Sequence, residues 1–189
     1  MVFRDPTRGI RLGSVLTLRT ELHDDKLRGL IERGESSLER AILALVAIHA
    51  VQAREIRSLG VRDVDFARST VKVVRPHLPE RIIHLDELTS RLLTEWIRGR
   101  NRQWPTTEND YLFMSANGAF SIQRPPVGAS KINAIFRRLG LTPRQVRIDR
   151  ILHEARVAAD LVHLMQVFGI SVTTAVTTSK RPIPNAADL

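Results

Sequence analysis

The chain places a helical segment, three short strand-like segments and a second helical segment in direct succession, and this order leaves few possible folds. Apolar residues recur with a helical period across residues 36–52, where Ser36 and Glu39 have the spacing of a capping box. The strand-like segments are rich in β-branched residues and lie at 61–66, 70–74 and 81–85. Because turn-forming residues separate them, they predict a small antiparallel sheet beside the helix.

The rest of the chain up to residue 158 is mainly helical. The further elements that we expect are helices at 54–59, 86–99, 130–139 and 143–158, a short strand at 111–114 and a turn at Asn117-Gly118. Thr142 and Pro143 provide an N-cap and a first helical residue for the last of these helices. The predicted fold class is therefore α+β and mainly helical, with a small antiparallel sheet packed on helices.

Length and composition favour one principal domain. A chain of 189 residues that is 43% hydrophobic can bury one sizeable core. Residues 1–20 contain glycine, proline and scattered arginines without a sustained period, so we expect an N-terminal arm or linker there. We expect the domain itself over residues 21–179, and the proline-containing residues 180–189 predict a flexible tail.

The charge balance indicates a polyanionic partner. Lys and Arg number 29 against 20 Asp and Glu, which gives a formal net charge of +9. Double-stranded DNA is the partner that we expect, and a basic surface that only aids solubility is the alternative. No uncharged apolar run reaches the roughly 18 residues of a membrane span, so we expect no membrane partner and a cytoplasmic, nucleoid-associated location.

Composition also limits the chemistry. The sequence has no cysteine, which excludes disulfides, thiolate metal sites and cysteine nucleophiles. Its 6 histidines lack the paired spacing with carboxylates that a zinc site requires, and no phosphate-binding glycine loop is present. We therefore expect neither a metal nor another cofactor.

Basic residues with helical spacing are the candidate DNA contacts. Arg144, Arg147 and Arg150 recur at intervals of three, which places their guanidinium groups close together on a helix and predicts a cationic ridge. The alternative is a solvated face that neighbouring carboxylates partly neutralise. The other cations that we expect at DNA are Lys72, Arg75, Arg81 and Lys131.

Residues 161–179 permit a second interpretation. An apolar first half, a glycine at position 169 and a hydroxyl-rich second half are typical of a helix-turn-helix unit. In such a unit Thr173, Thr174 and Thr177 contact DNA. This alternative predicts a DNA-binding regulator.

The order of the segments and the sequence boxes within them resemble the catalytic domain of the tyrosine recombinases, the phage-integrase superfamily. In that family a threonine-glycine-leucine-arginine type box ends with the first catalytic arginine, and an acidic residue follows three positions later. Here residues 49–52 read His-Ala-Val-Gln, and Glu55 matches the acidic position. The resemblance therefore places Gln52 where the first catalytic arginine belongs. We expect Arg54, two positions further on, to point to another face of the helix.

Two later boxes are matched by the same resemblance. Residues 80–85 match the strand that follows the catalytic lysine of the family, but the preceding turn contains no lysine. Residues 144–148 match the family's histidine-x-leucine-arginine-histidine box. Arg147 corresponds to the second catalytic arginine, and Arg144 replaces a histidine.

The nucleophile of the family is also missing. The tyrosine would fall at Thr178 or Ser179, and Ile170 replaces the histidine of the preceding glycine box. Threonine and serine are poorer nucleophiles than tyrosine because the pKa of their hydroxyl group is much higher. Glu55 and Arg147 thus remain as remnants of the catalytic set, and the resemblance implies a DNA-binding protein that does not cleave DNA.

The resemblance also bears on assembly. Recombinase domains often exchange their final helix with a neighbour, so a protein-interaction role is a third interpretation. The partner in that case is a second copy of the chain, in a homo-oligomer, or a full-length recombinase.

Overall fold

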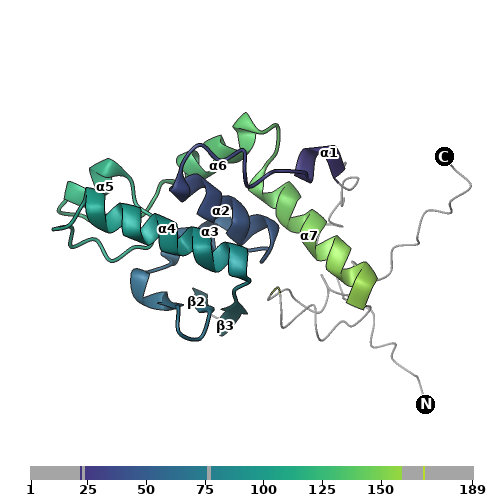
Figure 1. The fold of residues 1–189 in the computed structure, drawn as a ribbon, viewed down its shortest axis with the longest axis horizontal. Helices are drawn as coiled ribbons and strands as arrows, with labels where there is room; N and C mark the ends of the chain where they lie inside the picture. The colour runs from purple at the N-terminus through teal and green to yellow at the C-terminus, as the bar shows by residue number, and fades with distance from the viewer. Residues whose placement is uncertain (1–21, 23, 76–77, 159–167, 169–189) are drawn as a thin grey trace, which may run out of the picture.

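The computed structural model describes residues 22, 24–75, 78–158 and 168, and in these residues a set of helices packs on a small sheet (Figure 1). The helices are α1 (Asp24–Leu27), α2 (Ser37–Ala47), α3 (Ala53–Ser58), α4 (Glu87–Gln103), α5 (Ala116–Phe120), α6 (Ala129–Arg138) and α7 (Pro143–Ala158), and a 3-10 turn, η1, covers Val61–Asp63. The predicted fold class, α+β and mainly helical, is confirmed.

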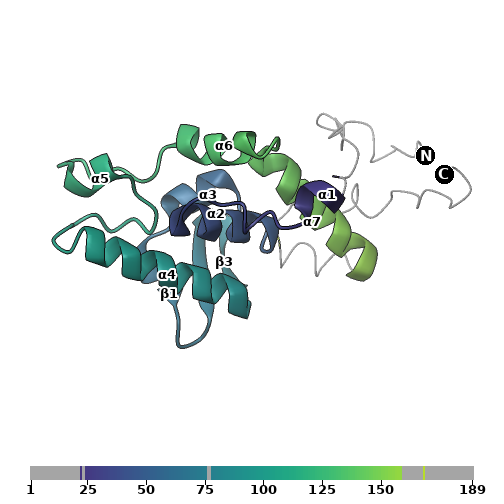
Figure 2. The same cartoon turned by 45° about the horizontal axis from the view of Figure 1, so that its top comes forward.

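The central helix is α2. Ser36 caps its N-terminus, because the Ser36 hydroxyl oxygen accepts a hydrogen bond from the backbone N–H of Glu39 at 3.3 Å. All residues from Ala41 to Val46 are buried, so this helix is enclosed on every side. It packs against both α4 and α7, which lie on different sides of it (Figure 2).

The sheet consists of β1 (Val64–Asp65), β2 (Thr70–Arg75) and β3 (Leu78–His84), which pair antiparallel in the order β1-β2-β3. Val73 pairs with Arg81, and both side chains are buried. Their neighbours Val74 and Ile82 are exposed, as the alternation of side chains along a strand requires. The register of the sheet therefore directs the Arg81 side chain into the interior.

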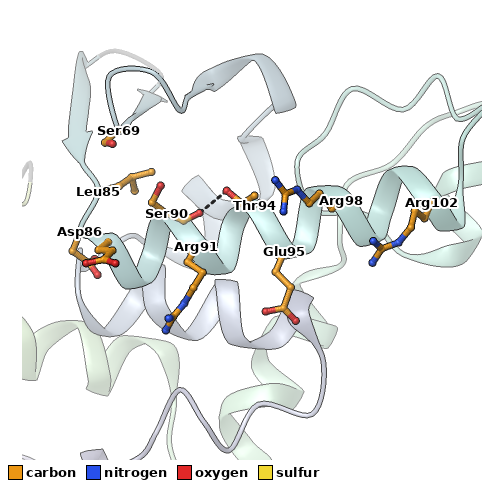
Figure 3. Close-up of a pocket in the computed structure, with 10 residues that line it drawn as sticks. Ser69, Leu85, Asp86, Ser90, Arg91, Thr94, Glu95, Arg98 and Arg102 are labelled. Carbon is orange, nitrogen blue, oxygen red and sulfur yellow. Dashed lines mark hydrogen bonds between the residues drawn. The ribbon is translucent and has the colours of Figure 1, made fainter.

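The long helix α4 begins after Asp86, whose carboxylate accepts a hydrogen bond from the backbone N–H of Thr89 at 3.0 Å. The inner face of α4 buries Leu92, Leu93 and Trp96. Its outer face is polar and lines a shallow cavity of about 730 Å³ (Figure 3).

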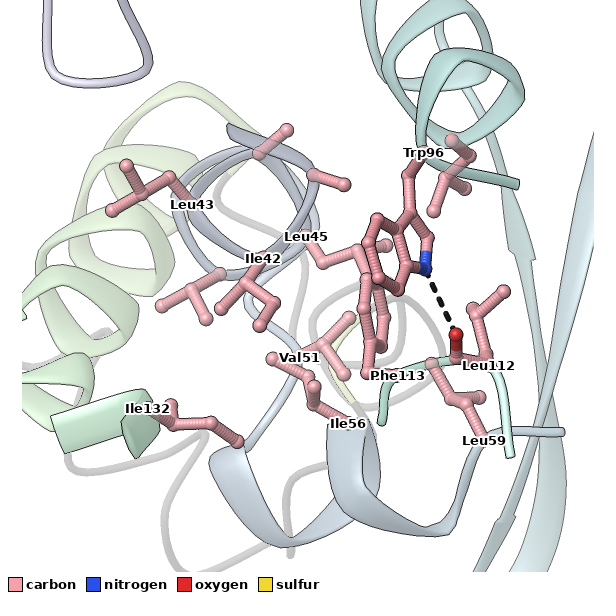
Figure 4. Packing of buried hydrophobic residues seen from close by; sticks show 14 of the residues in the cluster. Ile42, Leu43, Leu45, Val51, Ile56, Leu59, Trp96, Leu112, Phe113 and Ile132 are labelled. Atoms are coloured by element: carbon pink, nitrogen blue, oxygen red, sulfur yellow. Dashed lines mark hydrogen bonds between the residues drawn. The ribbon is translucent and has the colours of Figure 1, made fainter. Parts of the chain in front are cut away.

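Trp96 joins α4 to the buried segment 111–114. Its indole N–H donates to the carbonyl oxygen of Leu112 at 2.8 Å, and its ring stacks on Phe113 with 6.1 Å between the ring centroids (Figure 4). The strand predicted at 111–114 is wrong, because only an isolated bridge joins Tyr111 to Gly60. Consecutive buried apolar residues occur in strands and in irregular core segments alike, so their periodicity does not distinguish the two.

Other predicted elements differ in their boundaries, and the helix predicted at 86–99, which is α4, extends to Gln103. The helix predicted over 36–52 ends at Ala47. The first half of the strand predicted at 61–66 is the 3-10 turn η1, and only Val64–Asp65 form a strand, β1. The turn predicted at Asn117-Gly118 lies inside α5, where the hydroxyl oxygen of Ser115 accepts from the backbone N–H of Gly118 at 3.2 Å and so caps a short helix.

Within the described ranges no helix is both long and apolar enough to cross a membrane. The predicted arm at 1–20 and the predicted tail at 180–189 lie outside the described residues. The domain boundaries therefore stay predictions.

Candidate nucleic-acid interface

Three arginine side chains converge on the loop that joins α2 to α3, and we call them the arginine clamp. They bind three successive main-chain carbonyl groups, those of residues 48–50. Arg150 donates from Nε to the first carbonyl oxygen at 3.0 Å, Arg81 from Nη2 to the second at 2.6 Å, and Arg147 from Nε to the third at 2.8 Å. Each of these three carbonyl groups thus accepts a hydrogen bond from a different guanidinium group.

The position of the loop explains why it attracts cations. The loop directly follows the C-terminus of α2, where the last carbonyl groups have no partner within the helix and the negative end of the helix dipole lies. Ala50 adopts a left-handed conformation, with φ at 52°, at the position where the family box has a glycine. Such a conformation costs a residue with a side chain about 1–2 kcal/mol, so the charged hydrogen bonds of the clamp help to hold the loop in this shape.

Phe168 is bound by the same three arginines. Its carbonyl oxygen accepts from Arg81 Nη1 at 3.5 Å and from Arg147 Nη2 at 3.4 Å. The Arg150 guanidinium lies over its ring, with 5.6 Å between Cζ and the ring centroid. Its side chain is buried in a small cluster with Ala50, Ile151 and Ala155.

Glu55 supplies a negative charge to this cluster of arginines. Its side chain is only 3% exposed, and its Oε2 accepts from the backbone N–H of Gln52 at 2.8 Å. Its Oε1 has no hydrogen-bond partner among the residues that the structure describes. Burial lowers the pKa of Arg81 to about 10, while the charge of Glu55 acts in the opposite direction. Burial likewise lowers the pKa of Arg147.

A pocket of about 390 Å³ opens beside the arginine clamp, between α3, α6 and the start of α7. We call it the α3–α7 pocket. It is lined by Gln52, Ala53, Arg54, Asn133, Thr142, Pro143, Arg144 and Arg147. Three of these side chains are arginines and none is acidic, so the lining favours an anion.

The start of α7 contributes to the same lining. The Thr142 hydroxyl oxygen accepts from the backbone N–H of Gln145 at 3.2 Å, and the Gln145 side-chain oxygen accepts from the backbone N–H of Thr142 at 2.9 Å. This reciprocal capping fixes the first turn of α7 at the pocket. The positive end of a 16-residue helix therefore adds to the charge of the arginines.

The predicted cationic ridge on α7 is not present as one exposed surface. Arg144 is exposed at the α3–α7 pocket, whereas Arg147 and Arg150 are half-buried because both turn toward the α2–α3 loop. Arg150 also pairs with Glu154 at 2.8 Å, as the alternative of a partly neutralised face predicts. Arg144 is therefore the member of the three whose guanidinium is most accessible to a ligand.

The other predicted cations lie apart from the pocket. Lys131 pairs with Glu39 at 3.5 Å, and Lys72 pairs with Glu80 at 2.9 Å. Arg75 is half-buried, and its charge helps to lower the pKa of Arg81. Arg81 itself is 4% exposed and belongs to the arginine clamp.

Several predicted site residues lie outside the described part of the chain. These are Ile170, Thr173, Thr174, Thr177, Thr178 and Ser179. Of the predicted helix-turn-helix unit at 161–179, only Phe168 is described. The regulator interpretation and the position of the missing nucleophile therefore stay predictions.

The prediction that Arg54 points away from the site is wrong, because Arg54 is exposed and lines the same pocket as Gln52. Gln52 is the N-cap of α3 and has extended dihedral angles, φ −78° and ψ 148°. Helical spacing therefore does not relate its side chain to that of Arg54. Asn133 and Thr142 were also not predicted, since only the tertiary structure brings them to α3.

The side chain of His49, which belongs to the α2–α3 loop, is buried and contacts the start of α4. The His49 ring nitrogen Nε2 lies 3.0 Å from Asp86 Oδ2 and 3.2 Å from Thr89 Oγ1. Burial lowers the pKa of His49, and the nearby carboxylate of Asp86 opposes this effect. The network joins the N-terminus of α4 to the loop that the arginine clamp holds.

No metal centre is evident in the described ranges, where no three histidine, aspartate or glutamate side chains gather as ligands.

Comparison with known proteins defines the class. The phage integrase family description matches residues 22–163. This is most of the chain, so the protein belongs to the phage integrase family. Its fold is that of a tyrosine recombinase catalytic domain, which confirms the resemblance drawn from the sequence boxes.

Individual relatives agree with this placement. The tyrosine recombinase XerC of Shewanella amazonensis is 26% identical over 161 residues, which cover 81% of this chain and 53% of XerC. The crystal structure of XerA recombinase has a TM-score of 0.71 and 25% identity, and the match covers 86% of this chain and 61% of XerA. The XerH site-specific recombinase bound to difH substrate has a TM-score of 0.68 and 18% identity, with coverage of 90% and 53%.

The chain spans only part of such proteins. It covers between 32% and 53% of the length of the curated relatives that it matches. The activity and partners of whole recombinases therefore enter only as part of a proposal.

Proposed function

We propose that the protein binds double-stranded DNA through backbone phosphates at the α3–α7 pocket and does not cleave the strand. The observation that carries this proposal is the lining of the pocket, which combines three arginines with two neutral amides and no carboxylate. Guanidinium groups bind phosphate oxygens through paired, charge-assisted hydrogen bonds. The formal net charge of +9 favours the same partner.

The distribution of charge within the pocket favours a phosphodiester. Arg54 and Arg144 are exposed, so their guanidinium groups have N–H donors available for a ligand. Arg147 lies deeper and already donates to the α2–α3 loop, which fixes its position. Phosphate contacts of this kind position a protein on a duplex without reading its base sequence. We therefore expect binding that depends strongly on salt and weakly on sequence.

Two features of the chain support the absence of cleavage. Gln52 is uncharged where the family has its first catalytic arginine, and removal of one donor to a developing oxyanion typically lowers the rate by about a hundredfold to a thousandfold. Tyr111 is the only tyrosine of the sequence, and it pairs with Gly60 and is not part of the pocket lining. Phosphoryl transfer by the chemistry of the family needs an activated tyrosine at the phosphate.

Similar proteins support the choice of DNA as the partner. The XerH recombinase structure is a complex with difH substrate, and a Tn1549 transposon integrase structure holds transposon right end DNA. A full-length recombinase or a second copy of this chain remains the protein partner that we predict.

The first test measures binding to a random-sequence DNA duplex by fluorescence anisotropy across a series of salt concentrations. Each phosphate contact that is lost lowers the slope of log affinity against log salt by about one. We expect Arg54→Gln/Arg144→Gln to bind more weakly and to lower the slope by about two. The variant spares Arg147, whose loss would also disturb the α2–α3 loop.

Arg62→Gln/Arg68→Gln is the matched control, since both side chains are exposed and neither lines the pocket. An equal loss of slope in this control, or an unchanged slope in the pocket variant, would contradict DNA binding at the pocket. A denaturing gel of the same mixtures tests cleavage. A covalent protein–DNA adduct or a broken strand there would refute the non-cleaving part of the proposal.

A further inference from the structure

The outer face of α4 carries exposed arginines in a regular row. Arg91, Arg98 and Arg102 are separated by seven and four residues, which places them along one side of the helix. At a rise of 1.5 Å per residue they extend over roughly 16 Å. All three are exposed and line the shallow cavity of about 730 Å³ (Figure 3). We call this surface the α4 face.

The acidic residues of the α4 face are largely engaged elsewhere. Glu95 pairs with Arg40 at 2.7 Å. Asp86 accepts hydrogen bonds from Thr89 and lies 3.0 Å from the His49 ring nitrogen. Glu87 is the remaining carboxylate of the lining. In the described part of the chain the side chains of the three arginines make no hydrogen bond or ion pair. The lining therefore has three unpaired cations and one unpaired carboxylate, that of Glu87.

The α4 face lies away from the α3–α7 pocket. The opposite side of α4 buries Leu92, Leu93 and Trp96 against the core. Figure 2 shows α2 and α3 between α4 and α6. The α4 face and the α3–α7 pocket are thus two basic surfaces on different sides of the domain.

The chemistry of the α4 face favours a phosphate backbone over an acidic protein. Protein interfaces depend on large apolar or aromatic anchors at their centre. Leu85 is the one apolar residue of the lining, and it is buried. The other polar groups are three hydroxyls. Those of Ser69 and Ser90 can donate to phosphate oxygens, whereas that of Thr94 donates to the carbonyl oxygen of Ser90 at 2.9 Å.

We propose that the α4 face is a second nucleic-acid-binding surface, which holds the phosphate backbone of another DNA duplex through Arg91, Arg98 and Arg102. The first duplex is the one bound at the α3–α7 pocket, so this inference rests on the proposed function. One protein molecule then bridges two duplexes. Because the second surface contacts phosphates alone, its binding to DNA is expected to depend as weakly on base sequence as binding at the pocket.

A two-duplex capture experiment tests this inference. One biotinylated duplex is immobilised and saturated with protein, and the amount of a second, fluorescent duplex that the protein retains is measured. We expect the unmodified protein to capture the second duplex. We expect Arg91→Gln/Arg98→Gln/Arg102→Gln to bind the immobilised duplex and to lower capture at least tenfold. All three substitutions are at exposed positions, and thermal unfolding of the variant checks that the fold is retained.

Arg28→Gln/Arg62→Gln/Arg68→Gln is the control for total charge, since these exposed arginines line neither surface. Equal loss of capture in this control would overturn the inference. Undiminished capture in the α4 variant would also overturn it, and would mean that a second copy of the chain, and not the α4 face, bridges the two duplexes. Binding of the first duplex without any capture of the second overturns it while leaving the proposed function intact. No binding of the immobilised duplex contradicts the proposed function itself.

Discussion

Guanidinium groups of this protein serve different purposes according to their depth. Arg54 and Arg144 are exposed at the α3–α7 pocket, where their donors face solvent. Arg81 is only 4% exposed and binds the carbonyl oxygen of His49. A buried cation loses its hydration, and its interactions with the protein must replace it. The sequence does not distinguish these three arginines, whereas the structure separates exposed guanidinium groups at the pocket from a buried one that binds the main chain.

Arg81→Met tests the structural role of the arginine clamp. The substitution removes a buried donor from the α2–α3 loop and takes away one of the two buried guanidinium charges, those of Arg81 and Arg147, that interact with Glu55. We expect the free energy of unfolding to fall by about 3 kcal/mol or more, as is typical when one partner of a buried charge pair is removed. Urea unfolding followed by circular dichroism measures the change.

Lys72→Met is the matched control for Arg81→Met, because Lys72 lies on the same sheet in a partly exposed ion pair with Glu80. Its loss is expected to cost less than about 1 kcal/mol. Similar losses for the two variants would show that the buried hydrogen bonds of Arg81 do not hold the loop.

His49 makes stability depend on pH. Burial lowers its pKa in the folded protein, while the charges of Arg81 and Arg150 act in the same direction and Asp86 opposes them. The unfolded chain therefore binds more protons than the folded protein once the pH falls below the ordinary value of 6.5. We expect the free energy of unfolding to decrease as the pH is lowered through this value, by at most about 1.4 kcal/mol per pH unit.

Urea unfolding at successive pH values checks the contribution of His49. His49→Gln is expected to flatten the curve around and below pH 6.5. His84→Gln, at an exposed position, provides the control and should leave the curve as it is. A curve that keeps its slope in His49→Gln would assign the pH dependence to other groups.

At the scale of helices and strands, the end of α2 is the decisive feature. The apolar periodicity continues past Ala47, so the sequence predicts a longer helix, but the chain turns at Ala50 with a positive φ. The turn allows the carbonyl groups of residues 48–50 to face the arginine clamp. It also sets the direction of α3 and thereby brings Gln52 and Arg54 to one pocket.

The N-terminus of α4 is coupled to this turn through Asp86. The carboxylate caps the helix by accepting from the backbone N–H of Thr89 at 3.0 Å, and it also contacts His49. Asp86→Ala loses the cap, whereas asparagine caps helices about as well as aspartate. We expect Asp86→Ala to be less stable than Asp86→Asn by about 1 kcal/mol in urea unfolding. Equal stability of the two variants would mean that the cap contributes nothing measurable.

At the scale of the whole molecule, two basic surfaces lie on either side of a shared core. The α3–α7 pocket takes its cations from α3 and α7, and the α4 face takes its cations from a single helix. Between them the core contains α2, in which Ala41 to Val46 are all buried. A rigid core of this kind keeps the two surfaces at a fixed separation.

The fold could be predicted from the sequence to a large extent, because hydrophobic periodicity and capping residues define α2, α4, α7 and the sheet. The family box also places Arg147 at the pocket. What could not be predicted depends on contacts between distant segments. Lys131 pairs with Glu39, and Arg81 turns inward because of its register in β3. Neither fact is visible in local spacing.

The arginine clamp affects what a retained arginine says about catalytic activity in a member of this family. Under the proposed function, catalysis no longer selects for the arginines of the site, yet Arg147 and Arg81 still hold main-chain carbonyls together. Purifying selection on folding then preserves them for as long as the domain exists. Gln52 lines the pocket and is not part of the arginine clamp. An arginine that such a descendant keeps can be kept for folding alone, so it is weak evidence that the chemistry is retained. The loss of an arginine is stronger evidence that the chemistry has been lost.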